Sequence, residues 1–113
     1  MKYFIIAGEA SGDLHASNLM KGLRKTDPEA SFRFLGGDLM QEVSPDGLQY
    51  HYSKMNFMGL FAVLANLRVL SKILKNTKKE IIAFEPDAVI LVDYAGFNLR
   101  IAKFVARAGI TVF

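Results

Sequence analysis

The sequence contains no cysteine, which excludes a disulfide framework, a thiolate metal site and a cysteine nucleophile. It also lacks any uninterrupted apolar run that approaches the ~18 residues of a membrane span. The apolar run at residues 3–7 leads directly into Gly8 and Glu9, and it is too short for a secretory signal. We therefore expect a cytoplasmic protein.

Several ligand-binding motifs are missing as well. There is no group of His, Asp and Glu residues with metal-ligand spacing, and no Asp-x-Asp pair of the kind that holds a metal ion against a sugar-nucleotide pyrophosphate. The glycine-containing segment that follows the first apolar run is neither a Gly-x-Gly-x-x-Gly fingerprint nor a P-loop. We therefore expect no metal and no cofactor.

The composition describes a globular chain. Its 113 residues are enough for one domain, and a hydrophobic content of 51% provides for a substantial core. Such a chain is too apolar to be intrinsically disordered. Residues 109–113 are typical of a buried strand that begins after a helix. We therefore expect residues 1–113 to form one truncated domain of a longer protein.

Apolar runs and helical patterns alternate along the chain. Strands are predicted at residues 2–7, 32–35, 48–52 and 88–92 and from 110 onward, and helices at 14–25, 38–43, 58–84 and 97–108. We expect the run 88–92 to be buried on both faces, and Asp38 to cap the short helix that it begins. This order predicts an α/β fold, a Rossmann-like parallel sheet with helices on both faces. Ligands of such sheets bind outside the carboxyl ends of the strands.

The first candidate site is the loop at residues 8–13, after the first strand. Gly8 and Gly12 let the backbone turn sharply and approach a ligand, and a helix follows directly. The carboxylates of Glu9 and Asp13 would repel a phosphate, so they favour recognition of hydroxyl or amine groups, as on a sugar. The alternative is a tight strand-to-helix turn in which Ser11 or Asp13 is the N-cap residue.

The second candidate is Asp93, which follows the apolar run 88–92. A carboxylate at the carboxyl end of a central strand is partly desolvated, which favours a role as a general base. The alternative is a turn acid for the helix that begins near Phe97. His15 could face the same cleft or lie on a helix surface.

A basic stretch lies in the middle of the chain. Six of the 14 basic residues lie between Lys54 and Lys79 without a single acid, which leaves 8 basic against 11 acidic residues elsewhere. The net charge of +3 therefore comes from this stretch alone. Four of its cations form one helical stripe: Arg68, Lys72, Lys75 and Lys79.

The same stretch carries two groups of apolar residues. The first is a stripe for the core: Leu60, Val63, Leu67, Leu70 and Leu74. The second lies near the basic side: Met58, Phe61, Leu64 and Ala65. Apolar residues beside lysines favour contact with a bilayer and its anionic head groups. The alternatives are burial under another segment, or a nucleic acid, which the lack of interleaved aromatic residues disfavours.

Four blocks of the sequence resemble the N-terminal part of bacterial lipid-A-disaccharide synthases. The most specific is the run at residues 7–13, Ala-Gly-Glu-Ala-Ser-Gly-Asp. The others are Gly36-Gly37-x-x-Met40, then Met58-Gly59 with the helix after it, and the block from Pro86-Asp87 through Asp93 to Phe97-Asn98. The blocks occur in order over nearly the whole chain. One departure stands out, because Ala95-Gly96 replaces the Pro-Asp pair of the family.

The resemblance implies the N-terminal domain of a GT-B glycosyltransferase, whose second Rossmann-like domain holds the uridine nucleotide. The implied reaction transfers 2,3-diacylglucosamine from UDP to 2,3-diacylglucosamine 1-phosphate without a metal ion. The catalytic base of that reaction would be Asp93, since the second acid of its motif is absent. The implied substrate-binding residues are Gly8, Glu9, Ser11, Gly12, Asp13, Met58, Gly59 and Asn98.

Because both substrates carry acyl chains, the resemblance also implies a peripheral protein on the cytoplasmic face of the inner membrane. The expected membrane contacts are Phe61, Leu64, Arg68, Lys72 and Lys75. A nucleic-acid partner is not expected. The alternatives are a sugar-nucleotide epimerase of the same fold, a non-enzymatic flavodoxin-like or receiver-like domain, and a non-enzymatic peripheral-membrane domain. An epimerase would have no use for the apolar and basic helix, and a receiver domain requires paired acids after the first strand.

Overall fold

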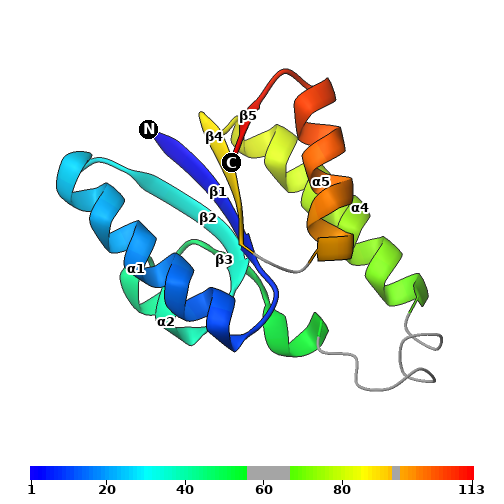
Figure 1. The fold of residues 1–113 in the computed structure, drawn as a ribbon, viewed down its shortest axis with the longest axis horizontal. Helices are drawn as coiled ribbons and strands as arrows, with labels where there is room; N and C mark the ends of the chain where they lie inside the picture. The colour runs from blue at the N-terminus through cyan, green and yellow to red at the C-terminus, as the bar shows by residue number, and fades with distance from the viewer. Residues whose placement is uncertain (56–66, 93–94) are drawn as a thin grey trace.

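The computed structural model describes residues 1–55, 67–92 and 95–113, which form a single five-stranded sheet between helices (Figure 1). The strands are β1 (Lys2–Ala7), β2 (Ser31–Gly36), β3 (Leu48–His51), β4 (Ala88–Val92) and β5 (Thr111–Val112). All neighbouring strands are parallel, in the order β3-β2-β1-β4-β5. The predicted Rossmann-like α/β fold is confirmed.

The helices lie in two layers. They are α1 (Ala10–Thr26), α2 (Asp38–Val43), the 3-10 helix η1 (Tyr52–Met55), α4 (Leu67–Phe84) and α5 (Ala95–Arg107). Helices α1 and α2 cover one face of the sheet, and α4 and α5 cover the other (Figure 1). The prediction of helices on both faces is therefore confirmed.

Several element boundaries differ from their predictions, and α5, for example, begins at Ala95 and not at Phe97. Helix α1 begins at Ala10, not at Leu14, because Glu9 is extended (φ −157°, ψ 171°) and is the N-cap residue. Residues 10–13 of the segment predicted as a loop thus form the first turn of a helix. The strand predicted to reach Tyr52 ends at His51, where the chain enters η1. The predicted helix at 58–84 is seen from Leu67 onward, and its earlier part lies outside the described residues.

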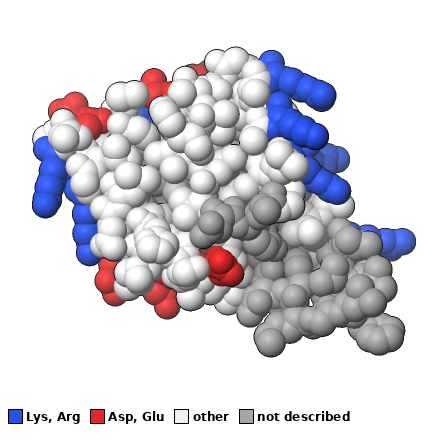
Figure 2. All heavy atoms as spheres, in the orientation of Figure 1, with Lys and Arg blue, Asp and Glu red and all other residues white. Residues whose placement is uncertain are grey.

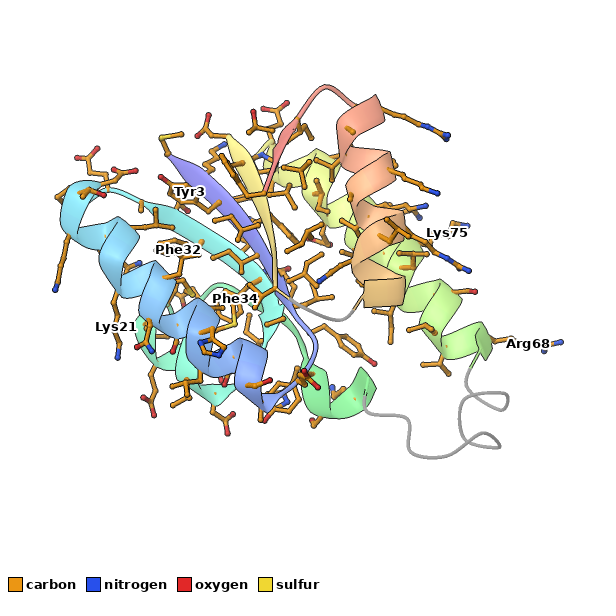
Figure 3. All side chains as sticks on the ribbon, viewed as in Figure 1. Tyr3, Lys21, Phe32, Phe34, Arg68 and Lys75 are labelled. Carbon is orange, nitrogen blue, oxygen red and sulfur yellow. The ribbon has the colours of Figure 1, made fainter. Side chains whose placement is uncertain are left out.

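Strand β1 lies at the centre of the sheet, and its side chains alternate between the two cores. Tyr3 and Ile5 lie in the core beneath α1 and α2, whereas Phe4 and Ile6 lie in the core beneath α4 and α5. Figure 3 shows Tyr3, Phe32 and Phe34 between the sheet and α1, and the rings of Tyr3 and Phe32 stack with their centroids 5.6 Å apart. Coverage of both faces explains why β1 is apolar from Tyr3 to Ala7.

Strand β4 is less buried than its composition predicts. Ala88 and Val89 are buried, whereas the residues from Ile90 to Val92 are only half-buried. Strand β5 pairs with Ala88 and Val89, and the N–H of Leu91 donates a hydrogen bond of 2.9 Å to the carbonyl oxygen of Phe113. Both faces of the second half are packed but only partly buried, since Leu91 contacts the core beneath α4 and α5, and Ile90 and Val92 contact the core beneath α1 and α2.

Gly37, which immediately precedes α2, lies at a point of close packing. A Cβ atom at this position would overlap the ring of Tyr52 and would approach Asp13 Oδ2 to 2.7 Å. Glycine is therefore the residue that lets the loop after β2 contact both α1 and η1.

We expect Gly37→Ala to lower the free energy of unfolding by about 1–3 kcal/mol, the usual cost of overpacking a tight contact. Gly22→Ala is the matched control, because an added methyl group there meets no neighbour within 4 Å. In a helix interior this change is expected to raise stability by up to about 1 kcal/mol. Urea denaturation measures both effects, and equal stability of Gly37→Ala and the parent protein would contradict the packing described.

Candidate functional site

The strand order reverses between β1 and β4. From β1 the chain builds β2 and β3 on one side, and then crosses to β4 and β5 on the other. Ala7 and Val92, the last residues of these two strands, are direct partners in the sheet. Parallel α/β sheets bind their ligands in the crevice at such a switch point. The residues that follow Ala7 are described, and Asp93, which follows Val92, lies outside the described residues.

The segment after β1 divides into buried and exposed residues. Gly8 and Gly12 are buried, and a Cβ atom on Gly12 would lie 3.2 Å from Ala7 Cβ. Glu9 and Ser11 are exposed, and Ser11 Oγ donates a hydrogen bond of 3.2 Å to Glu9 Oε1. Gly12 therefore allows α1 to approach the sheet, and Glu9 and Ser11 present polar atoms toward solvent at the carboxyl edge.

Asp13 has a partner that the sequence did not reveal. Its side chain is 3% exposed, and its two oxygens accept hydrogen bonds from the backbone N–H groups of Gly37, Leu39 and Met40, at 3.0–3.1 Å. These N–H groups belong to the amino end of α2, where a carboxylate also interacts favourably with the helix dipole. Asp13 on α1 thus caps α2.

This contact corrects two predicted caps. The N-cap position of α2 is occupied by Gly37, which has no side chain, so Asp38 does not cap its own helix. Neither Ser11 nor Asp13 is the N-cap residue of α1, because that position belongs to Glu9, whose side chain makes no capping bond. A direct contact between Asp13 and a substrate stays a prediction. Its observed contacts tie the loop after β1 to the loop after β2.

A second polar cluster extends this connection to β3. His51 Nδ1 accepts a hydrogen bond of 3.1 Å from the backbone N–H of Ser53 and lies 2.9 Å from Ser53 Oγ. Since a backbone N–H can only donate, Nδ1 is the acceptor and Nε2 carries the proton that Asp38 Oδ1 accepts at 3.0 Å. The sequence did not reveal this cluster, although a His and a Ser two residues apart are a local signal for it. His15, by contrast, is exposed on α1.

The other predicted site residues have separate positions. Asn98 is buried in the first turns of α5, at 5% exposure. Met58 and Gly59 lie outside the described residues. The Ala95-Gly96 pair begins α5, and a side chain at Gly96 would meet no neighbour within 4 Å.

The basic stripe on α4 faces solvent. Arg68, Lys72 and Lys75 are all exposed, and Figure 3 shows Arg68 and Lys75 pointing away from the sheet. Leu70 and Leu74 pack against the core, as the apolar stripe predicts. Phe61 and Leu64 lie outside the described residues. In the described part of the chain, no helix combines the length and hydropathy needed to cross a bilayer.

These features define a class, which is a Rossmann-like domain with exposed polar groups at the carboxyl edge beside its switch point. The family described as lipid-A-disaccharide synthetase matches residues 3–112. The chain therefore belongs to the lipid-A-disaccharide synthetase family.

The chain is also similar to curated lipid-A-disaccharide synthases. It is 41% identical over 111 residues to the one from Geobacter metallireducens, and 37% identical over 111 residues to the one from Geobacter sulfurreducens. Each match covers 98% of this chain but 29% of the relative. The protein from Syntrophus aciditrophicus is 38% identical over 109 residues, which cover 96% of this chain and 28% of that relative. The chain thus spans less than a third of the length of these relatives.

The two capping assignments can be distinguished by mutation. We expect Asp13→Ala to lower the free energy of unfolding by about 3 kcal/mol or more, because it leaves buried N–H donors at the start of α2 without an acceptor. Asp38→Ala is the matched variant, and since the Asp38 side chain is 86% exposed, we expect a loss of at most about 1 kcal/mol. Urea denaturation of both variants checks the difference. A larger effect at Asp38 would contradict the assignment of the cap to Asp13.

Proposed function

We propose that residues 1–113 form the acceptor-side, N-terminal domain of a lipid-A-disaccharide synthase of the GT-B fold. A second Rossmann-like domain, outside this chain, would hold the uridine nucleotide. Membership of the family supports this proposal, together with the share of its relatives that the chain spans. The observation that carries it furthest is the pairing of Ala7 with Val92, because the two motifs most typical of the family follow these two residues.

The proposed reaction transfers 2,3-diacylglucosamine from UDP to 2,3-diacylglucosamine 1-phosphate. The 6-hydroxyl oxygen of the acceptor attacks the anomeric carbon of the donor, and the bond between that carbon and the UDP oxygen breaks. Asp93 takes the proton of the attacking hydroxyl, and UDP leaves with the electron pair. The products are the β-1,6-linked disaccharide and UDP, and no metal ion takes part.

In this proposal the other site residues of the chain bind the substrate. Glu9 and Ser11 are exposed at the carboxyl edge, where they can hydrogen-bond sugar hydroxyls. In this proposal the backbone at Gly8 and Gly12 comes close to the substrate, and Asp13 holds the start of α1 against α2. Met58, Gly59 and Asn98 complete the acceptor site in this proposal.

We further propose that the protein acts as a peripheral protein on the cytoplasmic face of the inner membrane. The acyl chains of both substrates anchor them in the bilayer, so the enzyme has to reach them there. The exposure of Arg68, Lys72 and Lys75 on α4 supports contact with anionic head groups. Phe61 and Leu64 would enter the apolar part of the interface.

Replacement of the proposed base tests the chemistry. We expect Asp93→Asn in the complete protein to lower kcat by about 10²–10⁴, the usual contribution of a general base. Asp46→Asn is the control, because Asp46 is an exposed acid in the turn before β3, at the opposite edge of the sheet. Steady-state turnover with the acylated sugar substrates measures both. Near-normal turnover of Asp93→Asn would exclude Asp93 as the base.

Replacement of the apolar residues tests the membrane contact. We expect Phe61→Ser combined with Leu64→Ser to weaken binding to anionic liposomes at least tenfold, since each lost side chain contributes about 1.5–3 kcal/mol when buried. Leu14→Ser combined with Leu19→Ser is the control, because both leucines are exposed on α1. Liposome co-sedimentation measures the fraction bound. Equal binding by the Phe61 and Leu64 variant and the parent protein would refute the contact.

A further inference from the structure

Helix α5 carries a row of cations of its own, in addition to the basic stripe on α4. Arg100, Lys103 and Arg107 follow one another at helical spacing, and all three are exposed. The helix carries no acid between Ala95 and Arg107. Its opposite side is buried in the core, so the charged side is the one that faces away from the sheet.

Helix α4, like α5, carries mainly positive charges. Five cations lie on α4: Arg68, Lys72, Lys75, Lys78 and Lys79. Its one acid is Glu80, and this side chain lies 3.9 Å from Arg33 of β2, away from α5. We name the surface along the line where α4 and α5 meet the α4–α5 seam. Figure 2 shows Lys and Arg side chains gathered along the edge of the molecule that these two helices form in Figure 1.

The α4–α5 seam also contains two hollows that are lined in part by apolar side chains. One hollow of about 540 Å³ is lined by Leu70 and Leu74 of α4 and by Leu99, Arg100 and Lys103 of α5, among others. A second hollow, of about 410 Å³, is lined by Ile82, Ala83 and Phe104 and by three lysines of α4. Leu99 is 60% exposed and Ile82 is 49% exposed. Apolar side chains of this size on a basic surface are what an amphipathic membrane-binding face presents.

We propose that the α4–α5 seam as a whole, with α5 contributing as much as α4, is the surface that lies on an anionic lipid bilayer. This inference rests on the proposed membrane contact of α4 and extends it to a second helix. The cations bind lipid phosphates, and Leu99 and Ile82 enter the boundary between head groups and acyl chains. Two parallel helices fix the orientation of the domain on the bilayer, whereas one helix would leave it free to roll.

The chemistry of the seam favours a bilayer over a nucleic acid. A single strand requires exposed aromatic rings on which bases stack. Phe97 is buried, and the ring of Phe104 is covered by Lys78, whose Nζ lies 5.3 Å from the ring centroid. The exposed apolar side chains at the seam are aliphatic, which suits acyl chains.

The opposite layer provides a matched control. Helix α1 also carries cations, including Lys21, Arg24 and Lys25, but these have other partners or acids nearby. Arg24 donates a hydrogen bond to the carbonyl oxygen of Val43 and covers the ring of Phe32. Glu42 lines the same hollow as Lys21 and Lys25. The exposed pair Lys21 and Lys25 therefore allows the same change of charge outside the seam.

The experiment measures binding of the complete protein to vesicles of phosphatidylcholine with or without phosphatidylglycerol. We expect Arg100→Glu combined with Lys103→Glu to weaken binding to the anionic vesicles at least tenfold, because each cation at an anionic surface contributes about fivefold. Lys21→Glu combined with Lys25→Glu should change binding less than twofold. Leu99→Ser should weaken binding severalfold, and Leu19→Ser on α1 should not. Circular dichroism confirms that each variant is folded.

The outcomes separate this inference from the proposed function. If Arg68→Glu with Lys72→Glu abolishes binding while the α5 variants bind normally, then α4 alone contacts the bilayer and the inference is wrong. If the parent protein does not bind anionic vesicles, both the inference and the proposed membrane contact fail, and turnover still tests the transferase. Complete displacement from vesicles by millimolar inorganic phosphate would mean a single anion site and would overturn the inference. Loss of single-stranded DNA binding in the α5 variants, with unchanged vesicle binding, would overturn it too.

Discussion

The buried carboxylate of Asp13 is the contact on which the geometry of the carboxyl edge depends. It lies on α1, and it satisfies three N–H groups at the start of α2, which is 24 or more residues away along the chain. A helix end buried without an acceptor would cost stability at each donor. The same contact requires Gly37, because a side chain there would occupy the space of the carboxylate. Asp38 then continues the connection to His51, so the ends of β1, β2 and β3 are fixed relative to one another.

The two helix layers differ in their chemistry, although both bury apolar residues of the same sheet. The layer of α1 and α2 carries charges of both signs, and Arg24 is used for internal contacts. In the layer of α4 and α5, the charges that face the α4–α5 seam are cations. The proposed chemistry at the carboxyl edge and the proposed contact of α4 and α5 with the bilayer are therefore compatible, since they use different surfaces of the domain.

The sequence predicted the parts of the fold that depend on local patterns. The strands at 2–7 and 88–92 have the predicted bounds, because continuous apolar runs between polar turns are typical of parallel strands. The predicted start of α1 was wrong because Gly8 and Gly12 indicated a loop, whereas Gly12 lies in the first turn of α1, where an added Cβ atom would meet Ala7 and Val92. The prediction of the residue that caps α2 was wrong for a related reason. Local sequence favours Asp38, whereas the actual acceptor, Asp13, becomes a neighbour only when β1 and β2 pair.

The motif at residues 8–13 contains two kinds of residue, which differ in burial. Gly8, Gly12 and Asp13 are buried. The contacts of Gly12 and Asp13 explain their residue types without a ligand, since Gly12 allows close packing against Ala7 and Asp13 caps a second helix. Glu9 and Ser11 are exposed, and the bond that joins their side chains does not require either residue for the fold. A motif that identifies a family thus combines residues that build the edge with residues that are free to bind there. In this chain the two exposed members, Glu9 and Ser11, are the ones whose presence the fold alone does not explain.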